Sequence, residues 1–233
     1  MIELTGYQDK HEYVNKHGVK SVVYLMDCMD AMAQMGDKEF SLLCSDPPYG
    51  IKMHGGVTYQ RPSRPNSYGK PAKHKKKDWD SNRPTADFWK VANRITSNQI
   101  IFGANYFVEN LRPSMGWIYW GKMEDESNFS DGELIYTSFE RALKSIKIHQ
   151  FNGTNGGKDR MHPTEKPIAL YDWIFHNYAK PNDTILDTHL GSGSSRIAAD
   201  KHNLPFLGVE KDSDYFYAHC KRFDRYTAQL TLF

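Results

Sequence analysis

Short apolar runs alternate with helix-forming segments along most of this 233-residue chain. An apolar run of about four to eight residues that is bounded by turn residues predicts a buried strand. The clearest runs lie at residues 21–26, 40–45, 99–103, 117–120, 184–187 and 205–209. Strands that alternate with helices pack as a parallel sheet. We therefore expect an α/β fold, in which a doubly wound, mostly parallel sheet carries helices on both faces.

The expected helices follow from apolar spacing and from residues that favour helix starts. They lie at residues 29–35, 87–97, 162–178, 196–202 and 212–226. Thr85 or Asp87 is expected near the start of the second helix. In the third, Thr164 is the predicted cap and Pro167 is tolerated in the first turn.

Four other segments are less regular. Residues 133–139 and 145–151 alternate enough to predict two later strands that pair antiparallel at a sheet edge. Residues 1–18 are polar and aperiodic and give no clear signal for any element. A loop at about residues 51–79 is rich in Pro, Gly, Lys, Arg and Tyr, and so long a loop is typically functional or disordered.

Four acids occupy the same place in this pattern. Asp27, Asp46, Asp187 and Glu210 each stand at the carboxyl end of an expected strand. In open parallel sheets, ligands bind at that edge. One acid there would be unremarkable, but four predict a shared site.

The sequence Asp-Pro-Pro-Tyr-Gly follows the strand at residues 40–45. Pro47 and Pro48 fix φ and remove two backbone donors, so the loop is stiff. It offers the Asp46 carboxylate, free carbonyl groups and the Tyr49 ring. This set suits a planar group that carries an amine. The competing interpretation is an ordinary turn, because Asp, Pro and Gly all favour turns.

A glycine-rich loop, Leu-Gly-Ser-Gly-Ser-Ser, lies between an expected strand and an expected helix. It lacks the Gly-Lys-Ser/Thr of a phosphate-binding loop. It also departs from the dinucleotide fingerprint, because Arg196 stands at the third glycine position. Glu210 follows Gly191 by roughly the twenty residues that place an acid on ribose hydroxyls. A nucleoside without phosphates fits best, and a helix-start turn followed by a surface glutamate is the alternative.

Length and composition predict a single domain spanning residues 1–233. No apolar run approaches membrane-spanning length and no secretory signal is recognisable, so we expect a cytoplasmic protein. The three cysteines are widely spaced, and neither they nor the ten histidines show metal-ligand spacing. Net charge is only +2, but one segment concentrates positive charge. Its members are Arg61, Arg64, Lys70, Lys73, His74, Lys75, Lys76 and Lys77.

These motifs together resemble the amino-group DNA methyltransferases that use S-adenosyl-L-methionine, specifically their circularly permuted β class. Asp46-Pro47-Pro48-Tyr49 is similar to the catalytic D/S/N-P-P-Y/F motif, which comes first in that class. The segment at 162–167 matches H-P-T-x-K-P, and the segment at 187–194 resembles D-x-x-x-G-S-G-T. The segments at 27–28, 120–122, 129–133 and 208–210 also resemble the family. The resemblance covers roughly residues 20–225 and implies a Rossmann-like methyltransferase fold.

The resemblance assigns roles to particular residues. Asp46, Pro47, Pro48 and Tyr49 would be catalytic. The cofactor would be held by Asp27, Cys28, Asp46, His162, Thr164, Lys166, Asp187, Gly191, Ser192, Gly193, Ser194 and Glu210. Lys166 would lie near the cofactor carboxylate or near Asp46. The family has Pro and Phe where this chain has Thr188 and His189, which predicts an altered cofactor affinity.

The implied reaction is direct methyl transfer to an amine of a base rotated out of the DNA duplex. Asp rather than Ser before the prolines favours adenine N6 over cytosine N4 within the family. The alternatives are a cytosine-N4 enzyme, an RNA amino-methyltransferase and a catalytically silent DNA-binding module. The region available for sequence recognition, about residues 141–160, is reduced.

The basic segment is the other expected contact with DNA. Arg61, Arg64, Lys73, Lys75, Lys76 and Lys77 would clamp phosphates around the flipped base. A solvated charged loop is the alternative interpretation. The resemblance is compatible with a homodimer, with a bacterial or phage source and with a restriction-modification system.

Overall fold

The computed structural model describes residues 2–52, 77–122, 130–153, 161 and 164–230. Its strands are β1 (Asp9–Val14), β2 (Lys20–Leu25), β3 (Phe40–Ser45), β4 (Thr96–Phe102), β5 (Trp117–Gly121), β6 (Gly132–Thr137), β7 (Lys144–Lys147), β8 (Ile185–Asp187) and β9 (Phe206–Glu210). Its α-helices are α1 (Cys28–Met32), α2 (Ala86–Ile95), α3 (Ile168–Tyr178), α4 (Ser194–Lys201) and α5 (Ser213–Leu230). Two short 3₁₀ helices, η1 (Ala104–Tyr106) and η2 (Val108–Asn110), follow β4.

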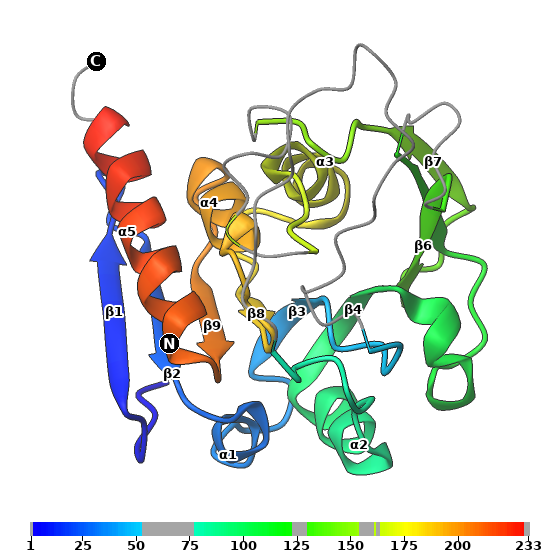
Figure 1. Cartoon of the computed structure of the whole chain (residues 1–233), viewed down its shortest axis with the longest axis horizontal. Coiled ribbons are helices and arrows are strands. Elements are labelled where there is room, and N and C mark those ends of the chain that lie inside the picture. The colour runs from blue at the N-terminus through cyan, green and yellow to red at the C-terminus, as the bar shows by residue number, and fades with distance from the viewer. Residues whose placement is uncertain (1, 53–76, 123–129, 154–160, 162–163, 231–233) are drawn as a thin grey trace.

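The described strands form a single nine-stranded sheet in the order β1-β2-β9-β8-β3-β4-β6-β5-β7. The run from β2 to β4 is parallel throughout. Helices α1 and α2 cover one face of the sheet, and α3, α4 and α5 cover the other (Figure 1). The predicted mostly parallel sheet with helices on both faces is therefore confirmed.

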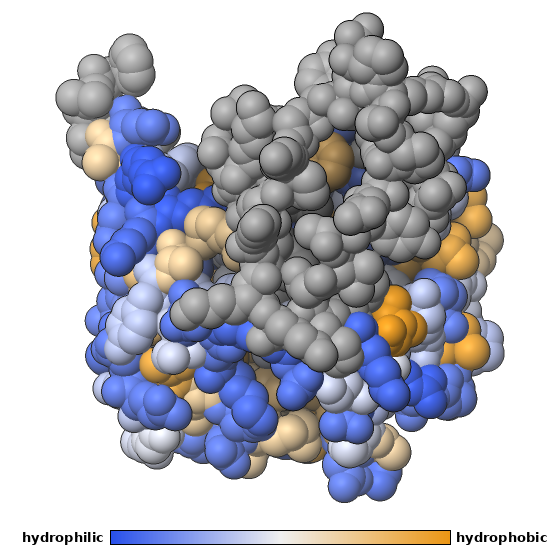
Figure 2. Space-filling model, viewed as in Figure 1, coloured by the Kyte–Doolittle hydropathy of each residue, from blue (hydrophilic) through white to orange (hydrophobic). Residues whose placement is uncertain are grey.

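Side-chain alternation explains why the central strands are apolar throughout. Leu42 and Cys44 of β3 face the core beneath α3 and α4, whereas Leu43 faces the core beneath α1 and α2. Successive strand residues point to opposite faces, and both faces are buried here. Along α5, Phe216 and Phe223 are buried, while the outer surface of this helix is mainly hydrophilic (Figure 2). The basic segment and part of the expected recognition region, residues 53–76 and 154–160, lie outside the described residues.

Two predictions about elements need correction, and one segment without a clear signal forms a strand. The polar residues 1–18 contain β1, which pairs antiparallel with β2 at the sheet edge. Strands β6 and β7 do not pair with each other, because β5 lies between them and pairs parallel with β7. Helix α3 begins only after Pro167, so Thr164 is not its cap. Residues 165–167 are not helical, and Pro167 itself has an extended backbone. The residue that precedes a proline disfavours helical backbone.

The buried Arg196 explains why a polar edge strand forms. Its Nη1 lies 2.9 Å from His11 Nδ1 of β1, and its Nε donates to Ser21 Oγ at 2.9 Å. The guanidinium also lies 3.9 Å from the ring centroid of Phe223. A buried charge must be hydrogen-bonded. Polar side chains of β1 and β2 therefore satisfy a residue of α4, which is a tertiary relationship that periodicity does not reveal.

Candidate functional site

The four predicted acids lie along one edge of the sheet. In the order of the parallel strands β2, β9, β8 and β3, they are Asp27, Glu210, Asp187 and Asp46. Asp187 and Glu210 end their strands, Asp46 follows β3 directly, and Asp27 caps helix α1 after β2. The expectation that they share the carboxyl edge of the sheet is confirmed.

The backbone that follows Asp46 and Tyr49 is hydrogen-bonded to Asp80, a residue distant in sequence. Gly50 has φ of +71° and its N–H donates to Asp80 Oδ1 at 2.9 Å. The N–H of Lys52 donates to the Asp80 carbonyl at 3.1 Å. A Cβ at Gly50 would lie 2.8 Å from Arg83 Cγ, so glycine fits both the backbone and the space. Asp80 thus fastens the loop directly after Tyr49.

A cluster of charged side chains surrounds Asp46. Lys166 Nζ lies 2.7 Å from Asp46 Oδ2 and 3.2 Å from Glu133 Oε1. The Tyr49 hydroxyl lies 2.6 Å from Asp46 Oδ1 and 2.6 Å from Glu133 Oε1. Lys122 pairs with the other Glu133 oxygen at 3.3 Å. Two carboxylates and two ammonium groups therefore converge on the edge of the sheet.

The cluster shifts the pKa of its members in different directions. Burial and the charge of Glu133 raise the pKa of Asp46, although Lys166 opposes them. Burial alone would raise the pKa of Glu133, but Lys166, Lys122 and the Tyr49 hydroxyl together lower it. Relative to the free acids, the cluster thus favours proton binding at Asp46 and disfavours it at Glu133. The single hydroxyl proton of Tyr49 can fill only one of its two short contacts with these carboxylates.

Glu133 and Lys122 were not among the predicted site residues. They belong to β6 and to the loop after β5, and β6 lies beyond β4 from the Asp46 strand. Their neighbourhood resembled the family in sequence, but nothing in the strand pattern placed them near Asp46. The antiparallel pairing of β6 with β4 brings Glu133 to the same edge. Lys166 lies beside Asp46, which is one of the two positions expected for it.

The Tyr49 ring is enclosed by aromatic and backbone groups. It stacks on Tyr106 of η1, and Phe107 meets it edge-on. A Cβ at Gly103 would lie 2.2 Å from two ring carbons of Tyr49. Gly103, with φ of +58°, therefore allows β4 to end against the Tyr49 ring.

The glycine-rich loop is shaped by Glu210 and by helix α5. The N–H of Gly191 donates to Glu210 Oε2 at 2.8 Å, and the N–H of Asp212 donates to Oε1 at 2.8 Å. Gly193 has φ of +72°, and a Cβ there would lie 2.1 Å from His219 Cδ2. The loop therefore runs close to α5 and tolerates no side chain at Gly193. Burial raises the pKa of Glu210 to about 6.

Asp187 supports this loop from within. Ser195 Oγ donates to its Oδ2 at 2.6 Å, and the N–H of His189 donates to its Oδ1 at 3.0 Å. Its carboxylate is buried, and burial raises the pKa of Asp187 to about 7. Ser192 and Ser194 are also buried, with hydroxyl oxygens 3.3 Å apart. These residues are gathered as predicted, and the visible role of Asp187 is to hold the loop.

Thr188 and His189, which depart from the family pattern, contact the end of β3 through Ser45. His189 Nδ1 is 3.0 Å from Thr188 Oγ1 and 3.2 Å from Ser45 Oγ, while its Nε2 faces Cys28 Sγ at 3.9 Å. Burial lowers the pKa of His189 to about 4, so the ring is neutral. Asp27 accepts from the N–H of Met29 and pairs with Lys211. The uncharged polar side chains of Thr188 and His189 thus stand at the two positions where the family pattern has Pro and Phe.

Two groups of predicted residues are placed differently. His162, Arg61, Arg64, Lys73, Lys75 and Lys76 lie outside the described residues. Lys77 is described, and its Nζ lies 2.5 Å from Asp212 Oδ1 and 3.0 Å from Asp214 Oδ2. Its ammonium also lies 4.4 Å from the ring centroid of Tyr215. Lys77 therefore contacts the start of α5, close to Glu210, instead of presenting a free cation to a phosphate.

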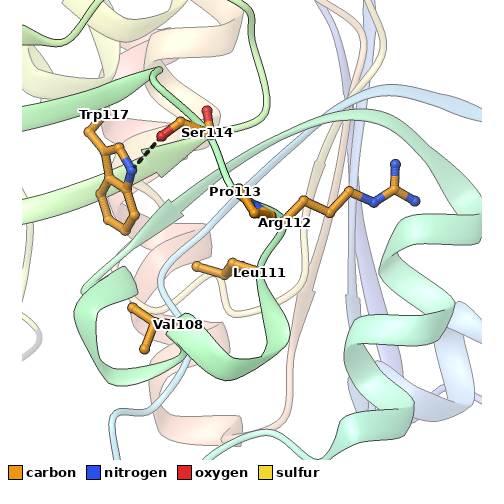
Figure 3. Close-up of a pocket in the computed structure, with 6 residues that line it drawn as sticks. All are labelled: Val108, Leu111, Arg112, Pro113, Ser114 and Trp117. Carbon is orange, nitrogen blue, oxygen red and sulfur yellow. Dashed lines mark hydrogen bonds between the residues drawn. The ribbon is translucent and has the colours of Figure 1, made fainter.

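A pocket of about 300 Å³ is formed by residues between η2 and the start of β5 (Figure 3). It is lined by Val108, Leu111, Arg112, Pro113, Ser114 and Trp117. The Trp117 indole N–H is bonded to the Ser114 carbonyl at 3.0 Å, and the Arg112 side chain points away from the pocket. None of the four acids of the sheet edge lines this pocket.

The described part of the chain holds neither a metal-binding cluster nor a membrane-spanning helix. No three or more His, Cys, Asp or Glu side chains in it are arranged to hold a metal ion. No helix of these residues is both long and apolar enough to cross a membrane.

Solved structures share this fold. M1.HpyAVI in complex with SAM superposes with a TM-score of 0.56 at 18% identity, covering 86% of this chain and 98% of that chain. The PvuII cytosine-N4-specific DNA methyltransferase superposes with a TM-score of 0.56 at 14% identity, covering 89% and 91%. At these identities the likeness establishes the Rossmann-like methyltransferase fold alone.

Sequence relatives extend over nearly the whole chain. Type II methyltransferase M2.MboI of Moraxella bovis is 24% identical over an aligned length of 257 residues. The alignment covers 89% of this chain and 89% of the relative. M2.DpnII of Streptococcus pneumoniae is 22% identical over 264 residues, which cover 91% and 92%. The DNA methylase family model N6_N4_Mtase matches residues 57–221. Because that match spans more than half of the sequence, the chain belongs to the N6_N4_Mtase family of DNA methylases.

Proposed function

We propose that this chain transfers a methyl group from S-adenosyl-L-methionine to the N6 amine of an adenine in DNA. Family membership supplies the reaction class. The position of Asp46 is the observation that supports the proposed site of methyl transfer. Its carboxylate lies directly after β3 and contacts both Lys166 and the Tyr49 hydroxyl. Asp instead of Ser at this position is the feature of the family resemblance that favours adenine.

The residues at the glycine-rich loop fit the nucleoside half of the cofactor. Glu210 lies at the end of β9 beside Gly191, where an acid can bind ribose hydroxyls. Gly193 lets the backbone come close, because a side chain there would collide with His219. Bound S-adenosyl-L-methionine supplies an electrophilic methyl group. Asp27, Cys28, His162, Thr164, Lys166, Asp187, Ser192 and Ser194 are the other proposed contacts.

The target base must leave the duplex, because its amine cannot be reached within the stack. In the proposed complex, the Asp46 carboxylate and the Pro47 carbonyl accept the two amine hydrogens. A carboxylate offers about four lone-pair positions, so Asp46 can accept an amine hydrogen while it keeps Lys166 and Tyr49. The Tyr49 ring would stack on the base, which is worth about 1–3 kcal/mol.

Holding both amine hydrogens turns the nitrogen lone pair toward the methyl group. No strong base is needed before attack, since the amine loses its proton after the new N–C bond forms. The raised pKa of Asp46, caused by burial and by Glu133, suits it to accept that proton. The rest of the rate would come from orientation and fixed electrostatics, to which Lys166 contributes by holding Asp46 in place.

The other proposed features concern DNA binding. The basic segment from Arg61 to Lys76 would contact phosphates, and the short region at residues 141–160 would limit sequence recognition. The relatives named as type II methyltransferases support a place in restriction-modification. A homodimer and a cytoplasmic location are part of the same proposal.

The test is to methylate unmodified DNA with the protein and labelled S-adenosyl-L-methionine, and then to digest the DNA to nucleosides. We expect N6-methyladenine. N4-methylcytosine without N6-methyladenine would refute the choice of base, and transfer to structured RNA alone would refute the choice of nucleic acid. Asp46→Ala should abolish transfer and retain cofactor binding. If the wild type binds cofactor and DNA but transfers no methyl group, the silent-module alternative is correct.

A further inference from the structure

Arg222 lies on α5, outside every motif that pointed to the methyl-transfer site. Its Nη1 donates to the Ser192 carbonyl at 2.8 Å and to Ser194 Oγ at 3.1 Å. Its Nη2 lies 3.0 Å from Glu165 Oε1. One guanidinium therefore binds the glycine-rich loop and the segment that carries Lys166.

Glu165 is the partner of Arg222 and the immediate neighbour of Lys166. Only 2% of its side chain is exposed, compared with 18% for Arg222. Its second oxygen accepts a hydrogen bond from the Met161 N–H at 2.8 Å. Lys166 contacts Asp46 and Glu133, whereas Glu165 contacts α5. Because Glu165 and Lys166 are adjacent in the chain, Arg222 and Asp46 hold neighbouring residues of one short piece of backbone.

Helix α5 is shaped to hold the glycine-rich loop at this position. His219, one turn before Arg222, fills the space beside Gly193. Both residues lie on the same helix face, because residues three apart are neighbours on a helix. The loop, Arg222, Glu165 and Lys166 thus form a continuous path from the cofactor loop to the catalytic acid.

We propose that the Glu165–Arg222 pair is a brace that transmits the state of the glycine-rich loop to Lys166. Both are positioning residues for methyl transfer, since neither contacts Asp46. When the loop holds the cofactor, the Ser192 carbonyl and Ser194 hydroxyl fix the guanidinium, and the guanidinium fixes Glu165 and the adjacent Lys166. The inference rests on the proposed cofactor site, but not on the choice of adenine.

Because the Glu165–Arg222 ion pair is largely buried, single and double substitutions of these two residues should affect methyl transfer differently. Removing one partner of a buried ion pair leaves the other charge unpaired, whereas removing both is often tolerated better. Arg222→Gln and Glu165→Gln should each slow methyl transfer by about tenfold or more at saturating cofactor, and the double variant should be no slower than the slower single variant. Arg222→Lys should restore little, because an ammonium group cannot span three acceptors as a planar guanidinium does.

The Met161 amide provides a readout that does not depend on catalysis. In protein labelled with ¹⁵N-methionine, the amide signal of Met161 can be assigned among nine methionines with a Met161→Leu variant. Titration with S-adenosyl-L-methionine should shift this signal in the wild type. In Arg222→Gln at saturating cofactor, the shift should be largely lost. A full shift in Arg222→Gln would overturn the brace.

Arg94→Gln is the matched control, because Arg94 pairs with Asp37 at 2.9 Å away from this path. It should change neither the Met161 shift nor the transfer rate. Additive rate losses in the double variant, or a raised cofactor Kd with an unchanged saturated rate in Arg222→Gln, would also overturn the inference. If no wild-type methionine signal responds to the cofactor, the proposed cofactor site itself fails, which is a different result from a retained shift in the variant.

Discussion

The rings of Tyr49 and Tyr106 lie nearly parallel, with centroids 4.9 Å apart and 14° between their planes. Tyr106 therefore covers one face of the aromatic ring that would stack on the target base. The Tyr106 ring stacks on the Tyr49 ring in the way that a base would stack on it.

We predict that the base takes the place of Tyr106, so that Tyr106→Ala removes a competitor. The Kd for DNA should then fall by about two- to tenfold, since an aromatic pair contributes about 0.5–1.5 kcal/mol. Tyr49→Ala should instead weaken DNA binding and transfer. Fluorescence anisotropy with labelled duplex DNA measures both effects. A decrease in affinity in Tyr106→Ala as large as that in Tyr49→Ala would mean that Tyr106 supports the platform.

Glu133→Gln tests how the charged cluster sets the basicity of Asp46. The amide can still meet the Tyr49 hydroxyl and Lys166, but the negative charge is gone. Because Glu133 helps to raise the pKa of Asp46, this pKa should fall, and the acid limb of the rate profile should move to lower pH.

The transfer rate of Glu133→Gln at neutral pH should fall by less than the roughly 100- to 10,000-fold associated with losing a catalytic proton acceptor. Single-turnover rates measured across pH provide both quantities. Glu109→Gln, an exposed position paired with Arg83, is the control and should keep the wild-type profile. An unshifted acid limb in Glu133→Gln would show that Glu133 does not influence Asp46.

His189→Phe should change how stability depends on pH. Burial lowers the pKa of folded His189 to about 4, below the unfolded value of about 6.5. The unfolded chain therefore takes up a proton between these values while the folded chain does not, so His189 lowers stability as pH falls from about 6.5 to 4. The full effect is about 3 kcal/mol at most.

The free energy of unfolding of wild type and His189→Phe should therefore converge or cross in favour of the variant toward pH 4. Urea denaturation at several pH values measures the difference. His17→Phe, at an exposed position, should leave the slope unchanged. Parallel pH curves for wild type and His189→Phe would contradict the prediction.

Lys77→Gln separates cofactor binding from phosphate binding. Since Lys77 is bonded to Asp212 and Asp214, its removal should disturb the start of α5 beside Glu210 and raise the cofactor Kd. The salt dependence of DNA affinity should stay the same. Neutralising Lys73, Lys75 and Lys76 should flatten it, by about 0.9 in logarithmic slope for each phosphate that the protein no longer neutralises. If Lys77→Gln alone made the DNA affinity less dependent on salt concentration, Lys77 would be a phosphate-binding residue after all.

The local features of the fold could be predicted because they depend on near neighbours. The run at residues 40–45 coincides with β3, since an apolar segment that is buried on both faces carries its own signal. Thr85 precedes α2 as expected. The acids at strand ends followed from the same pattern, because parallel strands end at one edge.

The sequence by itself determined the parallel α/β sheet and the acid-tipped edge on which Asp46 and Glu210 lie. Only the tertiary structure decided which distant groups complete the site. Glu133 reaches Asp46 because β6 pairs antiparallel with β4, and Arg222 reaches Glu165 because α5 packs on the glycine-rich loop. Periodicity reports which face of an element is buried, whereas the partner of a buried charge depends on how elements far apart in the chain are placed together.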